Sequence, residues 1–378
     1  MIKSIAVENF KCFNDQKEIP LSQINLFYGK NGRGKSTIIQ ILLLLAQTIR
    51  ETNDIRNLSL VGQLVQLGSF KDLQNAYNGK IMQPLKWLIK NDDESIQFAF
   101  EEFPNKQQLA SLCDFIVNNI NYLVSQGLGP GNGEVEDSTN NTCTMLPVSD
   151  IKLLQNLKNL QYVSADRFCP RDFSSIIEKA DVDRMGARGE NLINILANKG
   201  EQFQKMVGEA LSKILHGAAL QIKDNGADNI ELFMNSADGD NVFKPINVGF
   251  GYSYVLPIIV AALMAKENSI LIVENPEAHL HPGAQSRVMK FLIETAKKRN
   301  LQLFIETHSD HVVNGLRIAM KQKYEGIIPA DGEIVFFAHD NEHTNPEIEI
   351  INCDSEGELS AYPDDFLDEW SNQLIKLL

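Results

Sequence analysis

The sequence has few cysteines and no long apolar run. No two cysteines have the C-x-x-C spacing, so neither a disulfide framework nor a zinc ribbon is indicated. The most apolar segment, Ile38–Ala46, is much shorter than the roughly 18 residues that span a bilayer. The N-terminal stretch MIKSIAVENF alternates apolar and polar residues and does not resemble a secretory signal. We therefore expect a cytoplasmic protein with no membrane partner. The five cysteines are Cys12, Cys113, Cys143, Cys169 and Cys353.

Positive charge is also scarce. The 378 residues include 35 Lys and Arg against 49 Asp and Glu, a formal net charge of −14. This balance argues against a surface broadly devoted to nucleic-acid backbones, although a local basic groove stays possible. Because 43% of the residues are hydrophobic, the chain can bury a sizeable core in one large domain or two ordinary ones.

Hydrophobic patterning predicts alternating strands and helices. Near the N-terminus, the stretch INLFY is typical of a short buried strand that ends at Gly29, and Ser36–Arg50 is typical of a buried helix. Further on, SILIV and LQLFI are typical of buried parallel strands with a helix between them. The predicted strands are Ile2–Val7, Ile24–Tyr28, Ile96–Phe100, Ile230–Met234, Ser269–Val273, Leu301–Ile305, Ile334–Phe337 and Ile348–Ile351, and the predicted helices are Ser36–Arg50, Glu201–Leu215, Tyr254–Ala265 and Gly283–Lys297.

The loop between the first of these strands and helices reads GKNGRGKST, which matches G-x-x-x-x-G-K-[ST]. Backbone N–H groups of such a glycine-rich turn converge on an anion, and the N-terminus of the following helix adds partial positive charge. We expect Lys35 to reach the β- and γ-phosphates of a nucleotide and Ser36 to bind Mg²⁺. The predicted ATP-binding residues are Gly29, Lys30, Asn31, Gly32, Arg33, Gly34, Lys35, Ser36 and Thr37.

Two later strands end in residues that suit phosphate chemistry. The segment ILIVENPEAHLHP places Glu274 at the end of an apolar strand, where an acid can hold Mg²⁺ or its water, and adds Glu277 close by. The segment LQLFIETHSDH places His308 just beyond another strand, within reach of a γ-phosphate at the carboxyl edge of the sheet. We predict catalytic roles for Glu274, Glu277 and His308.

Two other patterns have more than one interpretation. The stretch NVGFGYSYVLPII puts two glycines and a serine before an apolar helix, either as an anion site or as ordinary packing of a helix start. Four histidines near the two strand ends could instead hold zinc or manganese. They are His279, His281, His308 and His311.

Together these segments resemble the heads of ABC/SMC-type ATPases, and more closely the bacterial AAA-family ATPases related to the overcoming-lysogenisation (OLD) and RecF-like proteins. The C-terminal stretch INCDSEGELSAYPDDFLDEW resembles the small tail domain DUF3696. The resemblance implies an α/β fold of the P-loop NTPase, ABC/SMC-head type. Its core would be a mixed sheet, with an antiparallel β lobe and a helical insert.

The resemblance also implies roles for particular residues. It assigns the glycine-rich loop to Walker A, Glu274 to the Walker B acid, Ala278–His281 to the D-loop and His308 to the switch histidine. The signature positions Gly249, Gly251 and Ser253 would contact the ATP bound to another subunit. Lys11 would approach the phosphates, and Gln66 would be the Q-loop glutamine that joins Ser36 and Glu274 at Mg²⁺. Such ATPases act as head-to-head dimers, so a homodimer or a higher assembly bridged by ATP is expected.

Two positions depart from the family pattern. Asn275 follows the Walker B acid where most ABC enzymes have a catalytic glutamate, and an amide cannot act as a general base. Either Glu277 substitutes for that glutamate, or hydrolysis is slow and the protein is a switch. Gly249 stands where the signature serine is usual, so backbone N–H groups or Ser253 would have to make its contact.

We predict five parts along the chain: an N-terminal ATPase lobe (1–125), a flexible loop (126–150), a helical and β insert (151–245), a C-terminal ATPase lobe (246–330) and the DUF3696-like tail (331–378). The leading functional hypothesis is an ATP- and Mg²⁺-dependent switch that controls a partner effector, such as a nuclease, in bacterial anti-phage defence. One alternative is a RecF- or SMC-like DNA-binding ATPase in repair, with DNA held by Arg167, Arg171, Arg184 and Arg188. Acidic residues are interleaved with these arginines, which favours structural salt bridges over DNA contacts. The other is an OLD-like nuclease, for which the tail offers only Asp354, Glu356 and Glu358.

Overall fold

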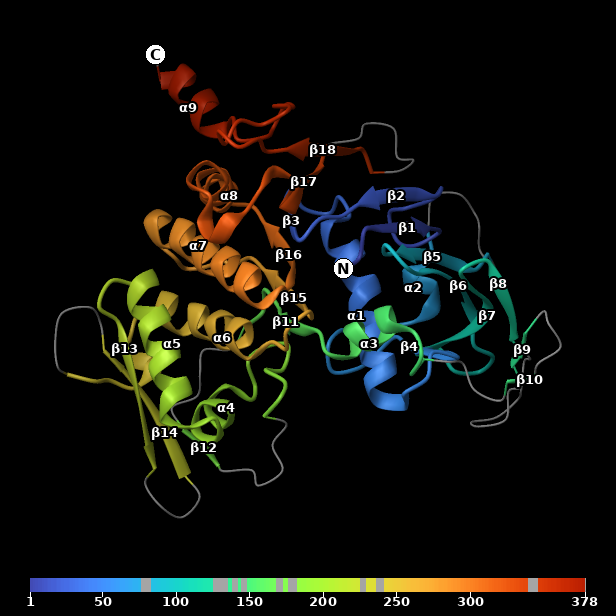
Figure 1. Ribbon diagram of the computed structural model, residues 1–378, viewed down its shortest axis with the longest axis horizontal. Helices are drawn as coiled ribbons and strands as arrows, with labels where there is room; N and C mark the ends of the chain where they lie inside the picture. The colour runs from blue at the N-terminus through green and yellow to red at the C-terminus, as the bar shows by residue number, and fades with distance from the viewer. Residues whose placement is uncertain are drawn as a thin grey trace. The chain divides into compact units, whose positions relative to one another are not determined.

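The chain forms two compact units, and each is described here by itself. The first unit comprises Met1–Leu160 and Val335–Ile350, and the second comprises Gln161–Ile334 and Ile351–Leu378. The structure is a computed structural model (Figure 1). It describes residues 1–75, 83–124, 135–137, 142–143, 148–167, 173–175, 182–224, 229–235, 241–338 and 346–377.

An antiparallel sheet forms much of the first unit. Its strand order is β10-β9-β8-β7-β6-β5-β1-β2, and β4 also pairs with β7. The bounds are β1 (Ser4–Glu8), β2 (Lys17–Pro20), β4 (Asn57–Ser59), β5 (Leu85–Lys90), β6 (Ser95–Glu102), β7 (Leu109–Val117), β8 (Ile120–Val124), β9 (Val135–Asp137) and β10 (Thr142–Cys143). Alternation of buried and half-buried residues along β5 and β7 is typical of strands with only one face in the core. Phe98 and Trp87 both pack in that core against Phe100.

The glycine-rich loop of the first unit joins β3 (Ile24–Gly29) to α1 (Lys35–Thr52). Every residue of β3 is buried, and 13 residues of α1 are buried, so the loop is held between two elements that are fixed in the core. The shorter helices α2 (Phe70–Leu73) and α3 (Lys152–Lys158) belong to the same unit. Strand β3 lies beside β17 (Gly332–Phe337), which in turn pairs with β18 (Ile348–Asn352); both later strands cross the division between the units.

Three parallel strands form the core of the second unit. They are β11 (Gln161–Val163), β15 (Ile270–Glu274) and β16 (Gln302–Thr307), with β15 in the middle. Helices α6 (Phe250–Met264), α7 (Pro282–Arg299) and α8 (Asp310–Gln322) connect and cover them, with α7 packed against α8 (Figure 1). Four of the five residues in β15 are buried, as expected for a parallel strand covered on both faces.

The second unit also holds a smaller α/β part and the C-terminal tail. The former contains α4 (Leu192–Asn198), α5 (Gly200–Ile214) and the antiparallel sheet β12-β14-β13. These strands are β12 (Phe173–Ser175), β13 (Ala219–Asp224) and β14 (Asn229–Asn235), and the short 3₁₀ helices are η1 (Pro245–Asn247), η2 (Tyr324–Gly326) and η3 (Pro329–Asp331). The tail ends in α9 (Glu369–Leu377).

The sequence-based expectations for the strand–loop–helix around Gly29–Thr37 and for the parallel pair β15 and β16 are confirmed. Helix α6 begins at Phe250, four residues before the expected start at Tyr254, so Gly251 and Ser253 lie in its first turn and not before it. Most of the predicted loop 126–150 lies outside the described residues. Of the part that is described, 135–137 and 142–143 form an antiparallel pair of short strands. Across the described residues, no helix combines the length and the apolar character that a bilayer crossing requires.

Candidate nucleotide site

Glycine is required at both ends of the loop between β3 and α1. Gly29 has φ 136°, and a Cβ there would lie 2.4 Å from the carbonyl oxygen of Phe337. Gly34 has φ 101° and is the N-cap of α1, where a Cβ would lie 2.8 Å from the Cys12 sulfur. By contrast, a Cβ at Gly32 (φ 74°) would meet nothing within 4 Å. The outer part of the loop is therefore open to a ligand, while its ends are closely packed.

The amine of Lys35 lies inside this loop. Its Nζ donates hydrogen bonds to the carbonyl oxygens of Gly29 (2.8 Å) and Lys30 (2.6 Å), and the residue is only 3% exposed. No acidic side chain occupies the first turn of α1, so its N-terminal N–H groups and the amine present positive charge together. Asn31 and Gly32 are exposed, and Arg33 and Ser36 are half-buried. This arrangement can bind an anion of the size of a phosphate group.

Lys11 lies in a tight turn of the first unit, with φ 52°. Its N–H donates to the carbonyl oxygen of Leu73 (2.7 Å), and its Nζ donates to Oε1 of Gln40 on α1 (2.5 Å). Burial lowers the pKa of Lys11 below the ordinary lysine value. The structure therefore places the Lys11 amine against the second turn of the helix that begins at the glycine-rich loop.

Gln66, the predicted Q-loop residue, is exposed and is held in place by a residue that the sequence did not single out. Gln47 of α1 donates from Nε2 to the carbonyl oxygen of Ser59 (2.7 Å). Its Oε1 accepts from the N–H groups of Leu64 (3.3 Å) and Val65 (3.0 Å). Gln47 thus attaches the turn that carries Gln66 to the helix that carries Ser36. The sequence signals this role of Gln47 only by placing an amide inside an apolar helix, where a buried amide needs hydrogen-bond partners.

In the second unit, Glu274 ends β15 and is held by the segment that follows β11. Its Oε2 accepts a hydrogen bond from the N–H of Ala165 (3.0 Å), and the hydroxyl of Tyr162 donates to the same carboxylate. Burial raises the pKa of the Glu274 carboxyl, and these two hydrogen bonds oppose the shift. Burial also raises the pKa of the Tyr162 hydroxyl, with the Glu274 charge as the next cause.

Arg167 joins the segment that follows β11 to the backbone of the turn that carries Glu274. Its Nη1 donates to the carbonyl oxygens of Ser164 (2.9 Å) and Glu274 (2.7 Å), and its Nη2 donates to that of Asn275 (2.7 Å). The side chain is 2% exposed, and burial lowers its pKa to about 10, still well above neutral pH. A charged Arg167 therefore lies behind the Glu274 turn. Sequence patterns suggested only a salt bridge or a DNA contact for this residue.

The turn after Glu274 is bound to the end of β16. Oε2 of Glu277 accepts from the hydroxyl of Thr307 (2.8 Å), and Oε1 accepts from the N–H of His308 (2.9 Å). Asn275 has φ 44°, and its N–H donates to the carbonyl oxygen of Glu306 (2.7 Å). The structure thus brings Glu274, Glu277 and His308 to neighbouring strand ends, with the His308 side chain exposed.

The signature positions lie at the start of α6. Gly249 is its exposed N-cap, and a Cβ at Gly251 would lie 2.7 Å from the carbonyl oxygen of His279. Ser253 is fully buried, and its Oγ has no hydrogen-bond partner in the part of the chain that is described. A direct contact of Ser253 with an external nucleotide would need the helix to move. Phe250, which is 62% exposed, is the large side chain that α6 presents at this end.

Two of the four histidines near these strand ends make packing or capping contacts. The His279 ring packs against the Tyr254 ring (4.4 Å between centroids), and Nδ1 of His281 accepts from the N–H of Gly283 at the start of α7. Among the described residues, no group of three or more His, Cys, Asp and Glu side chains could hold a metal ion.

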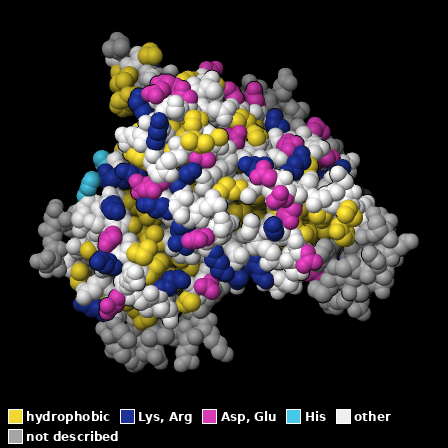
Figure 2. Space-filling model, viewed as in Figure 1, with side chains coloured by type: hydrophobic (Ala, Val, Ile, Leu, Met, Phe, Trp, Pro, Cys, Tyr) yellow, Lys and Arg dark blue, Asp and Glu magenta, His cyan; other side chains and the backbone are white. Residues whose placement is uncertain are grey.

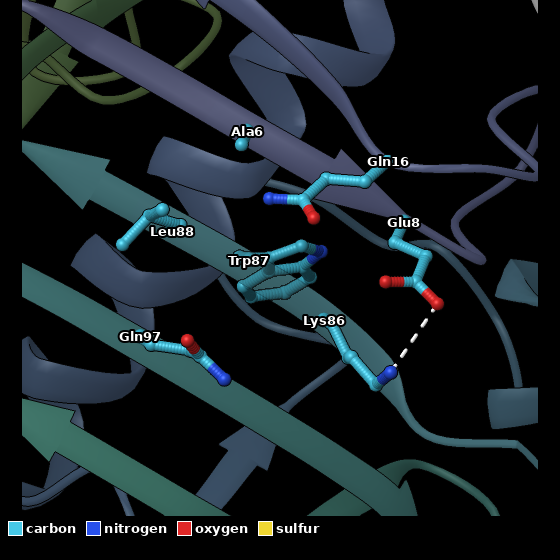
Figure 3. A pocket seen from close by; sticks show the side chains of 7 residues that line it. All are labelled: Ala6, Glu8, Gln16, Lys86, Trp87, Leu88 and Gln97. Atoms are coloured by element: carbon cyan, nitrogen blue, oxygen red, sulfur yellow. Dashed lines mark hydrogen bonds and ion pairs between the residues drawn. The ribbon is translucent and has the colours of Figure 1, made fainter.

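A small cavity on the antiparallel sheet of the first unit is separate from these residues (Figure 3). It has a volume of about 150 Å³, and Lys86 on its wall pairs with Glu8 at 3.2 Å. Trp87 lies on its floor, and the indole N–H has no acceptor among the described residues. The cavity is too small for a nucleotide, since ligand pockets usually exceed about 300 Å³.

Solved structures of Smc heads share this fold. An Smc head bound to the C-winged helix domain of ScpA has a TM-score of 0.56 at 15% identity, over 93% of this chain and 97% of that one. The Smc head domain with an extended coiled coil, bound to the C-terminal domain of ScpA derived from Pyrococcus furiosus, has a TM-score of 0.53 at 14% identity, over 100% and 99%. The expected ABC/SMC-head class is therefore confirmed.

Two curated proteins are distant relatives. The OLD nuclease of Thermus scotoductus is 23% identical over 82% of this chain, and the chain spans 59% of that protein's length. The ATP/GTP phosphatase of Helicobacter pylori is 21% identical over 85% of this chain and 89% of that protein.

Two family models match the chain. The model described as a protein of unknown function, DUF3696, matches residues 327–377, which confirms the resemblance seen in the tail. The model of the AAA ATPase domain matches residues 1–126 and 151–313, about three quarters of the chain. These ranges include the glycine-rich loop and the strand ends that carry Glu274 and His308. The chain belongs to the AAA ATPase domain family and is an ATPase.

Proposed function

We propose that this ATPase is a nucleotide-dependent switch. In this proposal, ATP bridges two copies of the chain head to head, and the bridged state controls a partner effector protein, such as a nuclease, in anti-phage defence. The observation that carries the proposal is the glycine-rich loop, whose ends are closely packed and whose interior holds the Lys35 amine. The distant relationship to an OLD nuclease supports the link to a nuclease.

Each unit contributes candidate residues to this function. In the first, Gly29–Thr37 would bind the phosphates, with Lys11 as an added cation. In the second, Glu274 would act at the metal and Glu277 and His308 near the γ-phosphate, while Gly249 and Gly251 would serve the ATP of the other copy. Ser253 would support that end of α6 from within, because it is buried.

Magnesium fits the donors assigned to it. The Ser36 hydroxyl, the Gln66 amide and the Glu274 carboxylate are hard oxygen donors, which Mg²⁺ prefers. Burial raises the pKa of Glu274, so a cation near that carboxylate would be favoured over a buried bare charge. When bound, Mg²⁺ would neutralise charge on the phosphates.

Slow turnover suits a switch. Asn275 follows the acid, and it cannot act as a base; its backbone is held in the left-handed region by Arg167 and Glu306. Glu277 is the remaining carboxylate of the turn, and both of its oxygens already accept hydrogen bonds. We therefore expect hydrolysis to be slow enough for the ATP-bound state to persist.

The DNA-binding alternative has less support. Arg167 is buried behind the Glu274 turn, and Arg188 pairs with Asp166 at 2.7 Å. Arg171 lies outside the described residues. The nuclease alternative relies on Asp354, Glu356 and Glu358, which form a self-capped turn.

In that turn, Oδ1 of Asp354 accepts from the N–H groups of Glu356 (2.8 Å) and Glu358 (2.9 Å). The two glutamates lie 3.9 Å from Lys321 and 4.0 Å from Arg317, respectively. These contacts are typical of a structural turn at the surface.

Light scattering tests the switch. The molar mass would be measured without nucleotide and with Mg·ATP for the wild type, Lys35→Ala and Lys71→Ala, an exposed lysine of the same unit. We expect Mg·ATP to raise the mass of the wild type and Lys71→Ala and to leave Lys35→Ala unchanged. A wild type that binds ATP but keeps the same mass and hydrodynamic radius would contradict the proposal.

A further inference from the structure

The C-terminal helix α9 has an apolar face that nothing in the described structure covers. None of its nine residues is buried. Its large apolar side chains are strongly exposed: Trp370 68%, Leu374 44%, Ile375 69% and Leu377 82%. In Figure 2, hydrophobic side chains of α9 stand at the surface near the C-terminus. Because Trp370, Leu374 and Leu377 recur at helical spacing, they form one stripe that is suited to a groove on a partner.

The second unit contains a groove of matching length. Helices α5 and α7 form its walls, the end of α6 forms its floor, and its volume is about 710 Å³. The wall residues on α5 run from Met206 to Ile214 and those on α7 from Arg287 to Arg299, which correspond to about 13 Å and 20 Å of helix. The nine residues of α9 span about 13 Å. A helix of this length can therefore lie along the groove.

The groove is preformed and has an apolar base. Nε of Arg287 donates to the carbonyl oxygen of Ile214 (2.7 Å), which joins α7 to α5. Nη2 of Arg299 donates to that of Ala265 (2.6 Å), which joins α7 to the end of α6. Leu263 and Phe291 lie between these two links. Little ordering would be needed before an apolar helix could bind.

The groove and the segment that leads into α9 have charges of opposite sign, while α9 itself has one acidic and one basic residue, Glu369 and Lys376. Five basic and three acidic side chains line the groove, which gives it a net charge of +2 in a chain whose net charge is −14. Lys213, Lys290 and Lys298 are exposed at its rim, and Figure 2 shows Lys and Arg side chains around hydrophobic ones over α5 and α7. The segment that enters α9 reads DDFLDE, with four acids in six residues. Such complementarity favours docking in a defined orientation.

We propose that α9 of one copy of this chain docks in the α5–α7 groove of a second copy. The contact uses two different surfaces, so a reciprocal exchange closes into a dimer with two such contacts, and a one-way exchange builds a larger assembly. This association involves residues of the second unit only and needs no nucleotide. It is therefore distinct from bridging by ATP.

Sedimentation velocity of the full chain without nucleotide tests this contact. The variants are Trp370→Glu on α9, Met206→Glu on the groove wall, and Asn372→Glu as a matched control on the polar side of α9. We expect the wild type and Asn372→Glu to self-associate, and Trp370→Glu and Met206→Glu to weaken the association about 30-fold or more, as for a central anchor residue. A wild type that stays monomeric, or variants that associate like it, would overturn the proposal.

Disulfide cross-linking tests the pairing directly. Leu374→Cys, on the apolar stripe of α9, and Met206→Cys would be prepared as separate proteins, mixed and oxidised. We expect a covalent dimer from the mixture that neither protein forms alone. If the double variant instead forms the disulfide only within one chain, α9 occupies its own groove and the proposal is wrong. Repeating the mixture with Lys35→Ala in both proteins should leave the yield unchanged, which separates this contact from the ATP-dependent one.

Discussion

Nη2 of Arg167 donates a 2.7 Å hydrogen bond to the carbonyl oxygen of Asn275, a residue with φ 44°. The same guanidinium also donates to the carbonyl oxygen of Glu274. Arg167 therefore holds the backbone turn that directs the Glu274 carboxylate, and its effect on ATP chemistry would act through the position of that acid.

Arg167→Lys should lower kcat for ATP with little change in KM, because the single nitrogen of lysine cannot reproduce the planar pair of donors, Nη1 and Nη2, that bonds the carbonyl oxygens of Glu274 and Asn275. Arg167→Ala should also lower the free energy of unfolding by about 3 kcal/mol, since buried carbonyl oxygens lose their donors. Steady-state ATPase assays and urea unfolding measure the two effects. Arg188→Ala, in the same segment and half exposed, serves as the control and should change stability by less than about 1 kcal/mol. Full activity in Arg167→Ala would show that the turn keeps its shape without the guanidinium.

Glu277→Gln tests whether Glu277 substitutes for the glutamate that Asn275 replaces. If Glu277 is the general base, kcat should fall about 100-fold while ATP affinity stays the same, because an amide cannot take a proton. Single-turnover hydrolysis and nucleotide titration measure these quantities, and thermal unfolding checks that the contacts with Thr307 and His308 are still made. Glu201→Gln, on exposed α5 surface, is the control. An unchanged kcat would remove Glu277 from the chemistry.

Gly29→Ala and Gly32→Ala should differ strongly although both lie in one loop at positive φ. At Gly29 the new methyl group would lie 2.4 Å from a backbone oxygen, so the strand or the loop must shift, and we expect a loss of at least about 3 kcal/mol in unfolding free energy. At Gly32 only the backbone strain remains, about 1 kcal/mol. Urea unfolding compares them, and equal losses would mean that the Phe337 contact is not rigid.

Cys113 should react slowly with alkylating reagents in the folded protein. Burial, followed by the charges of Glu101 and Asp114, raises the pKa of its thiol to about 11. At pH 8 its thiolate fraction, and hence its alkylation rate by iodoacetamide, should be about 200-fold below that of the urea-unfolded chain. Peptide mass spectrometry gives the rate for this residue alone. A folded rate equal to the unfolded one would contradict the shift.

The same shift sets the sign of a pH effect on stability. An unfolded thiol loses its proton near pH 8.5, whereas the folded Cys113 keeps it until about pH 11. Between these values the folded state binds more protons, so its stability falls as pH rises, and below pH 8.5 the contribution is constant. The difference in unfolding free energy between the wild type and Cys113→Ala should therefore change only above pH 8.5.

The region around the glycine-rich loop could be predicted because its signals are local. Gly29, Gly34 and Lys35 occur at fixed spacing between a β-like apolar run and a helical one, and the structure places them accordingly. The same holds for Glu274, which ends a strand of apolar residues.

The roles of Arg167 and Gln47 could not be predicted from sequence. Arg167 bonds to backbone oxygens that lie 107 and 108 residues further along the chain, and any residue type offers such an oxygen. Gln47 likewise bonds to backbone groups of a turn. For Ser253 the sequence pattern predicted a contact that the structure does not favour. Its place in a glycine-rich stretch suggested a ligand contact, but the helix directs its side chain into the core.

The packing of Gly29 against Phe337 has a consequence for biosynthesis. The first unit consists of Met1–Leu160 and the later segment Val335–Ile350, so the ribosome synthesises its two parts far apart in time. The carbonyl oxygen that packs against Gly29 is supplied by the late part. A nascent chain can thus form the antiparallel sheet early, as N-terminal parts generally do, but it can complete the loop only after residue 337 has emerged. Nucleotide binding would then report that translation has passed residue 337.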